Sequence, residues 1–551
     1  MTTVVQSPRL RWIRVHPIVS AVLGVVLVAT LVVGGKYTYN RLFPPALSCG
    51  SGMVVASAQE ACVGLNLDSS PFVSDEAPEF RALREQVRTN NAGAAGDYLG
   101  IVLLLNMTPV AGVDTYTTRE LYPQVEGAIT AIWRANATSA FGGESHKIKL
   151  YLANMGAGYR DWEEAVRQIK ANATSARVTS VVGLGQSTEQ TQSAAAALSG
   201  RTNEPHLPVI GATVTGDSMG IDPLTTLPIQ NFFRVSPTNS NTVQSAAKYL
   251  QDTPKEQILL VEDTAVGDDY TTSLRTAAAN WLKQPGKRTN SLQFRSPDGD
   301  SAVQRSDPLT DQFSTMHSNL CQARPAAVYF AGRGVDLAAF IRSWFEGAPC
   351  GTGKLNIVSG DDAASVIGDD VVAKAIEVGA VSLTYTALAT PDQWDPDRCA
   401  VGTPPAAEVS ETSGARRNYG TFLAAFTGKV NKCAPVAGAQ PTTNFPEADL
   451  GSGQAMLTHD AVAVAVTAGR RSSTAVEHPE TQAGMILGFT CTNMVAGASG
   501  WLGFYNGEAR DKPIPMVRLG ADHRVTTEKL VWPAEEVLNL PTSAKPGAEP
   551  C

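Results

Sequence analysis

Two hydroxyl side chains, Ser187 and Thr188, stand between a predicted strand at 178–183 and a predicted helix that begins at Glu189. They end the run Gly-Leu-Gly-Gln-Ser-Thr at 183–188. The free amides and the dipole at a helix N-terminus favour a negative group, and desolvating a carboxylate without such partners is costly. The run could therefore bind the carboxylate of a small ligand. Capping of the helix itself is the alternative interpretation, and both can hold at once.

The sequence lacks the residue patterns of common catalytic sites. Its seven histidines are scattered, with no H-E-x-x-H or comparable metal-ligand spacing. No G-x-x-x-x-G-K-[ST] phosphate loop occurs, and the run Gly-Ala-Ser-Gly at 497–500 is not a G-x-S-x-G nucleophile elbow. His459 and Asp460 lie within an apolar helical pattern, which is more typical of a packed pair than of a catalytic one. We therefore expect a protein that is not an enzyme and needs no cofactor or metal.

Predicted strands and helices alternate along the chain from Tyr98 onward, which is the pattern of a parallel α/β sheet. The first lobe is predicted to contain strands at 99–105, 147–153, 178–183 and 207–212, and helices at 119–135, 161–172 and 189–198. The second is predicted to contain strands at 258–262, 291–294, 326–331, 355–359 and 379–383, and helices at 271–282, 311–319 and 335–345. Helices at 418–426 and 455–468 and a strand at 515–518 follow. In such sheets ligands bind at the loops that follow the strands.

The pair Ser236-Pro237 marks the predicted end of the first lobe. Proline lacks the amide that a continuing strand or helix would use, so the short apolar piece at 231–235 stops there. Residues 239–241 read Asn-Ser-Asn, which are good N-cap residues, and apolar residues then recur at helical spacing. We predict that the chain crosses into the second lobe at this pair.

Residues 17–35 carry no charge and are nearly all Val, Leu, Ala, Ile and Gly. At about 1.5 Å per residue such a helix spans roughly the 30 Å of a bilayer's hydrocarbon core. Arginines at 9, 11 and 14 precede the run, and Lys36 and Arg41 follow it, which slightly favours a cytoplasmic N-terminus. We predict one retained transmembrane helix with the bulk of the chain extracytoplasmic. A cleaved signal peptide and a lipoprotein site at Cys49 are the alternatives.

Eight cysteines, at 49, 62, 321, 350, 399, 433, 491 and 551, form no C-x-x-C. Their even number and wide spacing favour disulfides over zinc, provided that the chain lies outside the reducing cytosol. The simplest pairing is sequential, namely Cys49–Cys62, Cys321–Cys350, Cys399–Cys433 and Cys491–Cys551. Isolated buried thiols are the alternative.

The composition is that of a globular protein, with 43% apolar and 17% charged residues, and 551 residues are enough for more than one domain. The net charge of −8 argues against a nucleic-acid partner, because proteins that bind nucleic acid need a basic face.

Over roughly residues 97–520 the order of elements and several motifs resemble the type I periplasmic binding proteins, in particular the Leu/Ile/Val-binding, branched-chain amino-acid branch. These motifs are Phe233-Arg234-Val235-Ser236-Pro237, Leu260-Val261-Glu262-Asp263, Val358-Ser359-Gly360-Asp361-Asp362, Thr458-His459-Asp460-Ala461-Val462 and Gly497-x-Ser499-Gly500-x-x-Gly503-Phe504. The resemblance implies an α/β fold of two doubly wound parallel-sheet lobes, joined by a three-crossover hinge that closes on a small ligand.

With the predicted transmembrane helix in front, this fold divides the chain as follows. Residues 1–16 are cytoplasmic, 17–35 span the membrane, and 36–96 form a stalk or N-terminal extension. Residues 97–237 and 386–500 form lobe 1, 238–385 and 501–520 form lobe 2, and 521–551 form a C-terminal tail.

The resemblance also implies ligand-binding residues. Ser187 matches the family's carboxylate-binding serine, and Thr188 is its neighbour. Thr215 matches a second hydroxyl contributor, and Tyr270 matches a tyrosine of the cleft.

An acid that pairs with the ligand's ammonium falls, by the same resemblance, at Asp361, or at Asp362 if the register slips by one residue. The alternative is a turn aspartate after a strand. Arg333 could reach the cleft as well, although we expect a surface arginine.

We therefore expect a membrane-anchored extracytoplasmic solute-binding protein that captures a small polar ligand, an amino acid or an amide-like molecule, for an ABC-type transporter. Its partners would be that ligand, an ABC permease and the membrane, through residues 17–35, and no nucleic acid. The alternative is a ligand-sensing or cell-envelope interaction protein that uses the same fold without transport.

Overall fold

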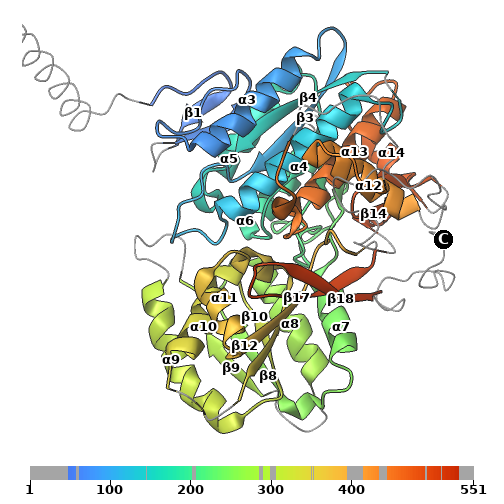
Figure 1. Cartoon of the computed structure of the whole chain (residues 1–551). Helices are drawn as coiled ribbons and strands as arrows, with labels where there is room; N and C mark the ends of the chain where they lie inside the picture. Colours follow the sequence, from blue (N-terminus) through green and yellow to red (C-terminus); the bar gives the residue numbers. More distant parts are fainter. Residues whose placement is uncertain are drawn as a thin grey trace, which may run out of the picture. The chain divides into compact units, whose positions relative to one another are not determined.

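The computed structural model describes residues 47–56, 61–143, 145–200, 206–283, 290–297, 306–348, 350, 353–393, 414–433, 444–490, 493–509 and 512–532. The residues from Cys49 onward form one unit, which contains two α/β lobes (Figure 1). The transmembrane segment predicted at 17–35 lies outside the described residues. Within those residues, no helix combines the length and the apolar character needed to cross a bilayer.

Lobe 1 is built on a nine-stranded sheet in the order β1-β2-β4-β3-β5-β6-β7-β16-β15. Its strands are β1 (Met53–Val55), β2 (Cys62–Asn66), β3 (Tyr98–Leu105), β4 (Lys147–Asn154), β5 (Val178–Gly183), β6 (Val209–Gly211), β7 (Phe232–Arg234), β15 (Phe504–Tyr505) and β16 (Glu508–Ala509). Neighbouring strands from β4 to β16 pair in parallel. Because helices cover both faces of a parallel sheet, its central strands are buried on both faces, and β5 is buried at every position.

The remaining elements of lobe 1 are α3 (Pro78–Ala92), α4 (Thr118–Ala137), η1 (Ala157–Tyr159), α5 (Trp162–Asn172), α6 (Glu189–Ser199), α12 (Gly414–Thr427), η5 (Glu447–Leu450), α13 (Gln454–Arg471), α14 (Thr481–Leu487), β13 (Val495–Gly497) and β14 (Gly500–Leu502). Helix α13 packs against α4, α14 and β5, so it is buried along nearly its whole length. Figure 1 shows this late segment, in orange, beside the cyan α4.

Gly127 is a point of close approach between α4 and α13. A β-carbon at Gly127 would lie 2.1 Å from the carbonyl oxygen of Ala455, a backbone atom that cannot turn aside. We expect Gly127→Ala to lower the free energy of unfolding by about 1–3 kcal/mol through overpacking, in spite of alanine's higher helix propensity. The matched control is Gly484→Ala in α14, where no atom lies within 4 Å of the added carbon. That control should be neutral or stabilising by up to about 1 kcal/mol. Urea denaturation would measure both, and equal effects would contradict the packing argument.

Lobe 2 is built on a seven-stranded sheet in the order β18-β17-β12-β11-β10-β8-β9. Its strands are β8 (Ile258–Asp263), β9 (Ser291–Phe294), β10 (Ala327–Ala331), β11 (Leu355–Ser359), β12 (Val381–Thr386), β17 (Ile514–Leu519) and β18 (Val525–Val531). Its helices are α7 (Asn239–Tyr249), η2 (Lys255–Gln257), α8 (Asp269–Leu282), α9 (Ser306–Ala323), α10 (Gly334–Glu346), η3 (Asp361–Val366) and α11 (Asp370–Glu377). The strands from β9 to β12 pair in parallel, and β17 and β18 extend the sheet antiparallel. The α/β pattern predicted for both lobes is confirmed.

Three crossovers join the lobes, and a buried lysine on the last crossover contacts the first. Lys512, on the last crossover between β16 and β17, donates to the carbonyl oxygen of Val235 at 3.0 Å, on the first crossover. It also donates to Ser499 Oγ at 2.7 Å. The carbonyl oxygen of Ser499 accepts from Gln393 Nε2 at 3.3 Å, on the second crossover after β12. The hinge strands are thus held together by hydrogen bonds at a position that water does not reach.

Two ends of the predicted lobes differ from the structure. The segment predicted as a stalk at 36–96 contains β1 and β2, and β2 pairs antiparallel with β4 in the sheet of lobe 1. The tail predicted to begin at 521 instead continues as β18, which pairs with β17 in lobe 2. These strands are placed by backbone pairing with a neighbouring strand of the sheet, which a local sequence pattern does not specify.

The last passage between the lobes also lies later than predicted. Residues 501–520 were expected in lobe 2, but β15 and β16 belong to the sheet of lobe 1, where Glu508 pairs with Arg234 of β7. The buried Arg234 guanidinium donates from Nη2 to Glu508 Oε1 at 2.8 Å. Lobe 1 therefore extends to Ala509, and the chain enters lobe 2 at β17.

The disulfides predicted between Cys49 and Cys62 and between Cys321 and Cys350 are confirmed. Cys433 is also disulfide-bonded. Cys399, Cys491 and Cys551 lie outside the described residues, so the two later pairings stay predictions.

Candidate functional site

A small cavity lies between the two lobes, at the ends of their parallel strands. Its lining consists of Glu120, Gln124, Gly185, Gln186, Ser187, Thr213, Thr215, Tyr270, Arg333, Asp361, Asp362, Leu388 and Gln454. The free space among these side chains is about 20 Å³, which is room for about one water molecule. The lobes are therefore closed on each other in this structure, and polar side chains fill the cleft.

The loop between β5 and α6 turns sharply toward the cleft. Three successive residues, at 183–185, have positive φ angles, and one of them is the non-glycine residue Leu184 at 76°. A β-carbon at Gly185 would lie 2.5 Å from the hydroxyl of Tyr159, which accepts a hydrogen bond from the Gln186 amide at 3.0 Å. The close approach of Tyr159 thus requires glycine at 185, and it directs the following residues into the cleft.

Ser187 lies in the cleft, whereas Thr188 caps the helix. The hydroxyl of Ser187 accepts a hydrogen bond from the Gly216 amide at 2.9 Å. Thr188 Oγ1 accepts from the Thr191 amide at 3.3 Å and is not part of the cavity lining. The contacts of Thr188 are therefore those of a helix cap.

The N-terminus of α6 contacts lobe 2 directly. The Glu189 amide donates to the carbonyl oxygen of Gly267 at 3.1 Å, and the carbonyl oxygen of Ser187 accepts from the Tyr270 amide at 3.1 Å. The position predicted for a ligand carboxylate is therefore occupied by groups of the second lobe while the cleft is closed.

Thr215 and Asp361 meet across the cleft, as expected of two residues that line one site. Thr215 Oγ1 donates to Asp361 Oδ1 at 3.3 Å. Burial raises the pKa of Asp361 to about 7, and the neighbouring negative charge of Asp362 adds to the rise. In the closed cleft this carboxyl is therefore partly protonated near neutral pH.

Tyr270 is fully buried at the start of α8. It contacts the loop that carries Asp361 and Asp362, and it also contacts Arg333. Its hydroxyl accepts a hydrogen bond from the Asp362 amide at 3.1 Å. Its ring lies under the guanidinium of Arg333, 4.5 Å from the ring centroid, an arrangement that stabilises the cation through the π face. Burial raises the pKa of Tyr270 well above its usual range, so the hydroxyl stays protonated.

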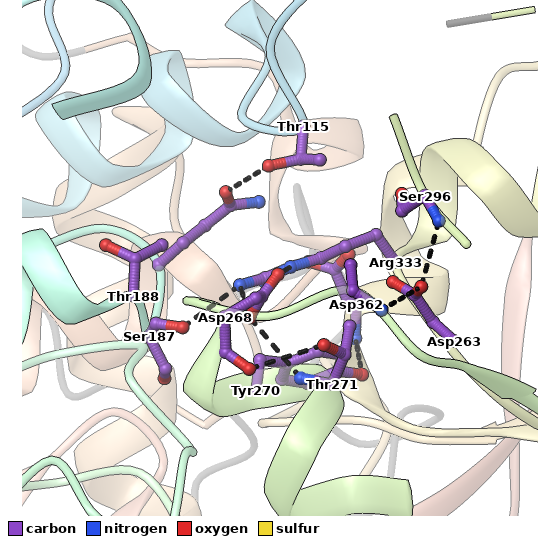
Figure 2. A network of polar contacts seen from close by, with 12 residues as sticks. Thr115, Ser187, Thr188, Asp263, Asp268, Tyr270, Thr271, Ser296, Arg333 and Asp362 are labelled. Carbon is purple, nitrogen blue, oxygen red and sulfur yellow. Dashed lines mark hydrogen bonds and ion pairs between the residues drawn. The ribbon is translucent and has the colours of Figure 1, made fainter. Parts of the chain in front are cut away.

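Arg333 is the centre of the polar network (Figure 2). Only 2% of this residue is exposed, so the expectation of a surface arginine is wrong. Its Nε and Nη2 atoms both donate to the Asp268 carboxylate at 2.8 Å, and Nη1 lies 3.5 Å from Asp362. Nη2 also donates to the carbonyl oxygen of Ser187 in lobe 1 at 3.2 Å. The guanidinium thus neutralises acids of lobe 2 and joins the two lobes.

Glu120 is a third acid of the cleft that the sequence prediction missed. Its Oε2 accepts from the Thr117 amide at 2.8 Å, which completes a capping box at the start of α4, and Oε1 accepts from Gln186 Nε2 at 3.1 Å. Burial raises the pKa of Glu120 to about 8, and the charge of Asp362 contributes. The spacing Thr117-x-x-Glu120 is visible in the sequence as a helix-start signal, but nothing local indicates that the glutamate also faces a cleft.

Carboxyl groups outnumber cationic groups in the cleft. Among the described lining residues the charged groups are the carboxyls of Glu120, Asp361 and Asp362 and the guanidinium of Arg333. Arg333 makes its shortest contacts with Asp268, outside that lining. A ligand that fits this site should bring positive charge.

One group in the described part of the chain has the composition of a metal site, namely His317, Cys321 and Cys350. Two of its three members form the disulfide between α9 and the segment after α10, so their sulfur atoms are not available as thiolate ligands.

The sequence matches no family model and no curated protein. Many solved structures are similar, among them the following three. The leucine-binding protein LivK from Thermotoga maritima is 19% identical, with a TM-score of 0.51 over 79% of this chain and 98% of that one. The branched-chain amino acid transporter substrate-binding protein LivJ from Streptococcus pneumoniae, solved with isoleucine, is 14% identical, with a TM-score of 0.51 over 79% of this chain and 100% of that one.

An ABC transporter substrate-binding protein from Desulfitobacterium hafniense, solved with leucine, is 15% identical, with a TM-score of 0.50 over 78% of this chain and 100% of that one. Similarity at this level of identity shows the fold alone. The chain has the α/β fold of the type I periplasmic binding proteins, as the order of its sequence motifs predicts.

Proposed function

We propose that the protein is an extracytoplasmic solute-binding protein whose cleft captures a small ligand with an ammonium group, such as an amino acid. The observation that carries the proposal is the excess of buried carboxyl groups between the lobes. Asp361 is buried, and among the described residues no cation lies within ion-pair distance of it. Because an unpaired buried carboxylate is costly, a ligand ammonium at this position would bind favourably.

The other end of an amino acid would meet donors from lobe 1. Ser187 and Thr215 present hydroxyl groups in the cleft next to the N-terminus of α6. Ligand binding would replace the contact that now closes the α6 N-terminus, in which the Glu189 amide donates to the carbonyl oxygen of Gly267 in lobe 2. A ligand carboxylate is a suitable replacement, since free helix amides favour a negative group.

Entry of the ligand requires the lobes to separate, because the closed cleft leaves about 20 Å³ of free space. Among the described residues the contacts between the lobes at the cleft include hydrogen bonds from Thr215 to Asp361 and from Arg333 to the carbonyl oxygen of Ser187. Water can replace such contacts when the lobes part, whereas separating apolar surfaces would cost far more. A ligand that contacts groups of both lobes would shift this equilibrium toward a ligand-bound form in which the lobes close around it.

Delivery to an ABC permease is the use of the captured ligand that we propose, with residues 17–35 as a membrane anchor. The similarity of the fold to substrate-binding proteins of ABC transporters supports transport. The second candidate is a sensor that uses the same closure without transport, and a retained anchor would favour it. Permease and ATPase genes beside this gene would support transport, whereas a kinase gene would support sensing.

A screen of amino acids by thermal shift, followed by calorimetry with the ligand that stabilises the protein most, tests the cleft. We expect Asp361→Asn to weaken binding of an ammonium ligand by about 2–5 kcal/mol, at least about 25-fold, because the variant leaves the buried ammonium without its counter-charge. Binding by the parent should strengthen from pH 6 to pH 8. The raised pKa of Asp361, about 7, means that the carboxyl is neutral at the lower pH and ionised at the higher one.

The control is Asp252→Asn, at an exposed turn position far in sequence from the cleft loops. It should bind with the affinity of the parent at both pH values. The proposal fails if Asp361→Asn binds as tightly as the parent, or if ligands without an ammonium group stabilise the protein equally well.

A further inference from the structure

A second and much larger cavity lies beside α3 and α4. Its volume is about 680 Å³, which is within the range of about 300–1,000 Å³ that is common for small-molecule sites. Its lining consists of Glu79, Ala82, Leu83, Gln86, Thr118, Arg119, Tyr122, Pro123, Glu126, Ala364, Ile367, Asn444, Phe445, Pro446, Ala448, Asp449 and Ser452. None of these residues lines the cleft between the strand ends. The cavity is thus a separate place for a ligand, and it is open while the cleft is closed.

Most of the wall of this cavity is apolar. Leu83, Tyr122 and Phe445 present aliphatic and aromatic surface from three different segments of the chain. Ile367 adds apolar surface from lobe 2, just after η3. A molecule with a hydrocarbon or aromatic body would bury its apolar surface there.

Glu126 is a buried carboxyl in this wall. The residue is 6% exposed, and its Oε2 atom is buried without a hydrogen-bond partner. Burial raises the pKa of Glu126 to about 9, and the charge of Asp449 contributes to the rise. Buried polar atoms are nearly always paired in native proteins, so an orphan carboxyl oxygen that lines a cavity indicates a missing partner.

The other charged and titratable groups at this cavity do not supply that partner. Glu79 and Asp449 are acids, and Tyr122 is neutral because burial and the charge of Glu79 raise its pKa. Arg119 donates instead to the carbonyl oxygens of Ile367 at 3.0 Å and Gly368 at 2.9 Å. When Glu126 is ionised, the net charge of the groups at the inner wall is therefore negative.

We propose that this cavity is a second ligand site, for a small organic ammonium ion with an apolar body, in which Glu126 and Asp449 bind the ammonium group and Tyr122 and Phe445 contact the body. Because Ile367 belongs to lobe 2 and Glu126 to lobe 1, the occupant contacts both lobes. The assignment does not depend on what the cleft binds.

The empty site has a stability cost that can be measured. A carboxyl whose pKa is higher in the folded than in the unfolded chain destabilises the fold above the unfolded pKa, and the cost grows until the pH reaches the folded pKa. For Glu126 this interval runs from about 4.5 to about 9. We therefore expect Glu126→Gln to melt at a higher temperature than the parent, by an amount that increases between pH 5 and pH 8.

The binding test is calorimetry on the full-length protein with 2-phenylethylammonium chloride at pH 8, and with 3-phenylpropionate as a probe of similar size and opposite charge. The ammonium probe should bind and the propionate should not. Glu126→Gln should weaken binding of the ammonium probe at least tenfold, whereas Glu163→Gln, at an exposed position of α5, should bind like the parent.

In the parent, binding should release protons, because pairing with the ammonium ionises Glu126. Titration in phosphate and in Tris, whose ionisation heats differ, detects that release.

Several results would overturn the assignment. They are no binding of the ammonium probe at millimolar concentration, equal binding of both probes, or unchanged affinity in Glu126→Gln. Loss of binding in Asp361→Asn with no loss in Glu126→Gln would place the probe in the cleft instead. Because the melting temperature of Glu126→Gln is measured in the same series, failure of the variant to fold cannot be mistaken for loss of the site.

Discussion

Replacing Asp460 with alanine is expected to lower the free energy of unfolding at pH 7 by about 3–5 kcal/mol, the usual cost of breaking a buried charge network by removing one partner. Asp460 is completely buried in α13. Its carboxylate accepts from the amides of Ala498 at 2.5 Å and Ser499 at 2.9 Å, and from the Ser499 hydroxyl. Alanine would leave all of these donors without an acceptor.

The hydrogen bonds around Asp460 have defined donors and acceptors. Arg134 can only donate, so Nε2 of His459 accepts its hydrogen bond at 2.7 Å, and Nδ1 carries the proton that is donated to Asp460 at 2.9 Å. Burial lowers the pKa of His459 to about 4, which keeps the ring neutral. On the other side, Lys512 donates to Ser499 Oγ and so connects Asp460 to the hinge. The substitution should therefore loosen the crossovers as well as α13.

The pH dependence of the free energy of unfolding gives an independent check of this prediction. Burial alone would raise the pKa of Asp460, but the hydrogen bonds and charges of His459, Lys512 and Ser499 hold it below its ordinary value. A lowered pKa contributes stability that is present above the unfolded pKa and lost as the pH falls through the folded one. The difference in the free energy of unfolding between the parent and Asp460→Ala should thus become smaller below about pH 4.

Urea denaturation at pH 7 measures the loss, with Asp252→Ala at an exposed turn as the matched control. The control should change the free energy of unfolding by less than about 0.5 kcal/mol. A loss below about 1 kcal/mol for Asp460→Ala would mean that the network contributes little, and the assignment of Asp460 as its centre would be wrong.

Replacing Arg333 with methionine should have the second large effect. Methionine is chosen because it keeps much of the side-chain volume and removes the charge. Asp268 and Asp362 would lose their cation, and the free energy of unfolding at pH 8 should fall by about 3–5 kcal/mol. The loss should be smaller at pH 5. Burial already raises the pKa of Asp362 in the presence of Arg333, so without the cation this acid would be protonated more readily and the unpaired charge would disappear.

Arg333→Met should also favour the open form, since the hydrogen bond from Arg333 to the carbonyl oxygen of Ser187 joins the lobes. Small-angle scattering should then give a larger radius of gyration than for the parent. Arg524→Met, at a side chain that is 85% exposed, is the matched control for both measurements.

Adding Asp268→Asn and Asp362→Asn to Arg333→Met should restore part of the lost stability, because neutral amides do not need a counter-ion. If this triple variant is no more stable than Arg333→Met alone, then lost packing, and not unpaired charge, accounts for the effect.

Much of the secondary structure was predictable because its signals are local. The strands β5, β9 and β11 have the predicted bounds, since short strand-like segments set between turn residues can be recognised from the local sequence. The first crossover follows Ser236-Pro237 for an equally local reason, the missing amide of proline. His459 and Asp460 were expected to be a packed pair because both lie within an apolar helical pattern, and both are completely buried.

The sequence by itself therefore determined the alternation of strands and helices, the two lobes and the loops that face the cleft. Tertiary structure alone decided that β1, β2 and β18 join the sheets, because each is placed by the strand with which it pairs. It also decided that Arg333 is buried, because the acids that make burial of a guanidinium tolerable are distant in sequence, with Asp268 65 residues away. A buried charge is stable only beside its counter-charge, and only the folded chain brings the two together.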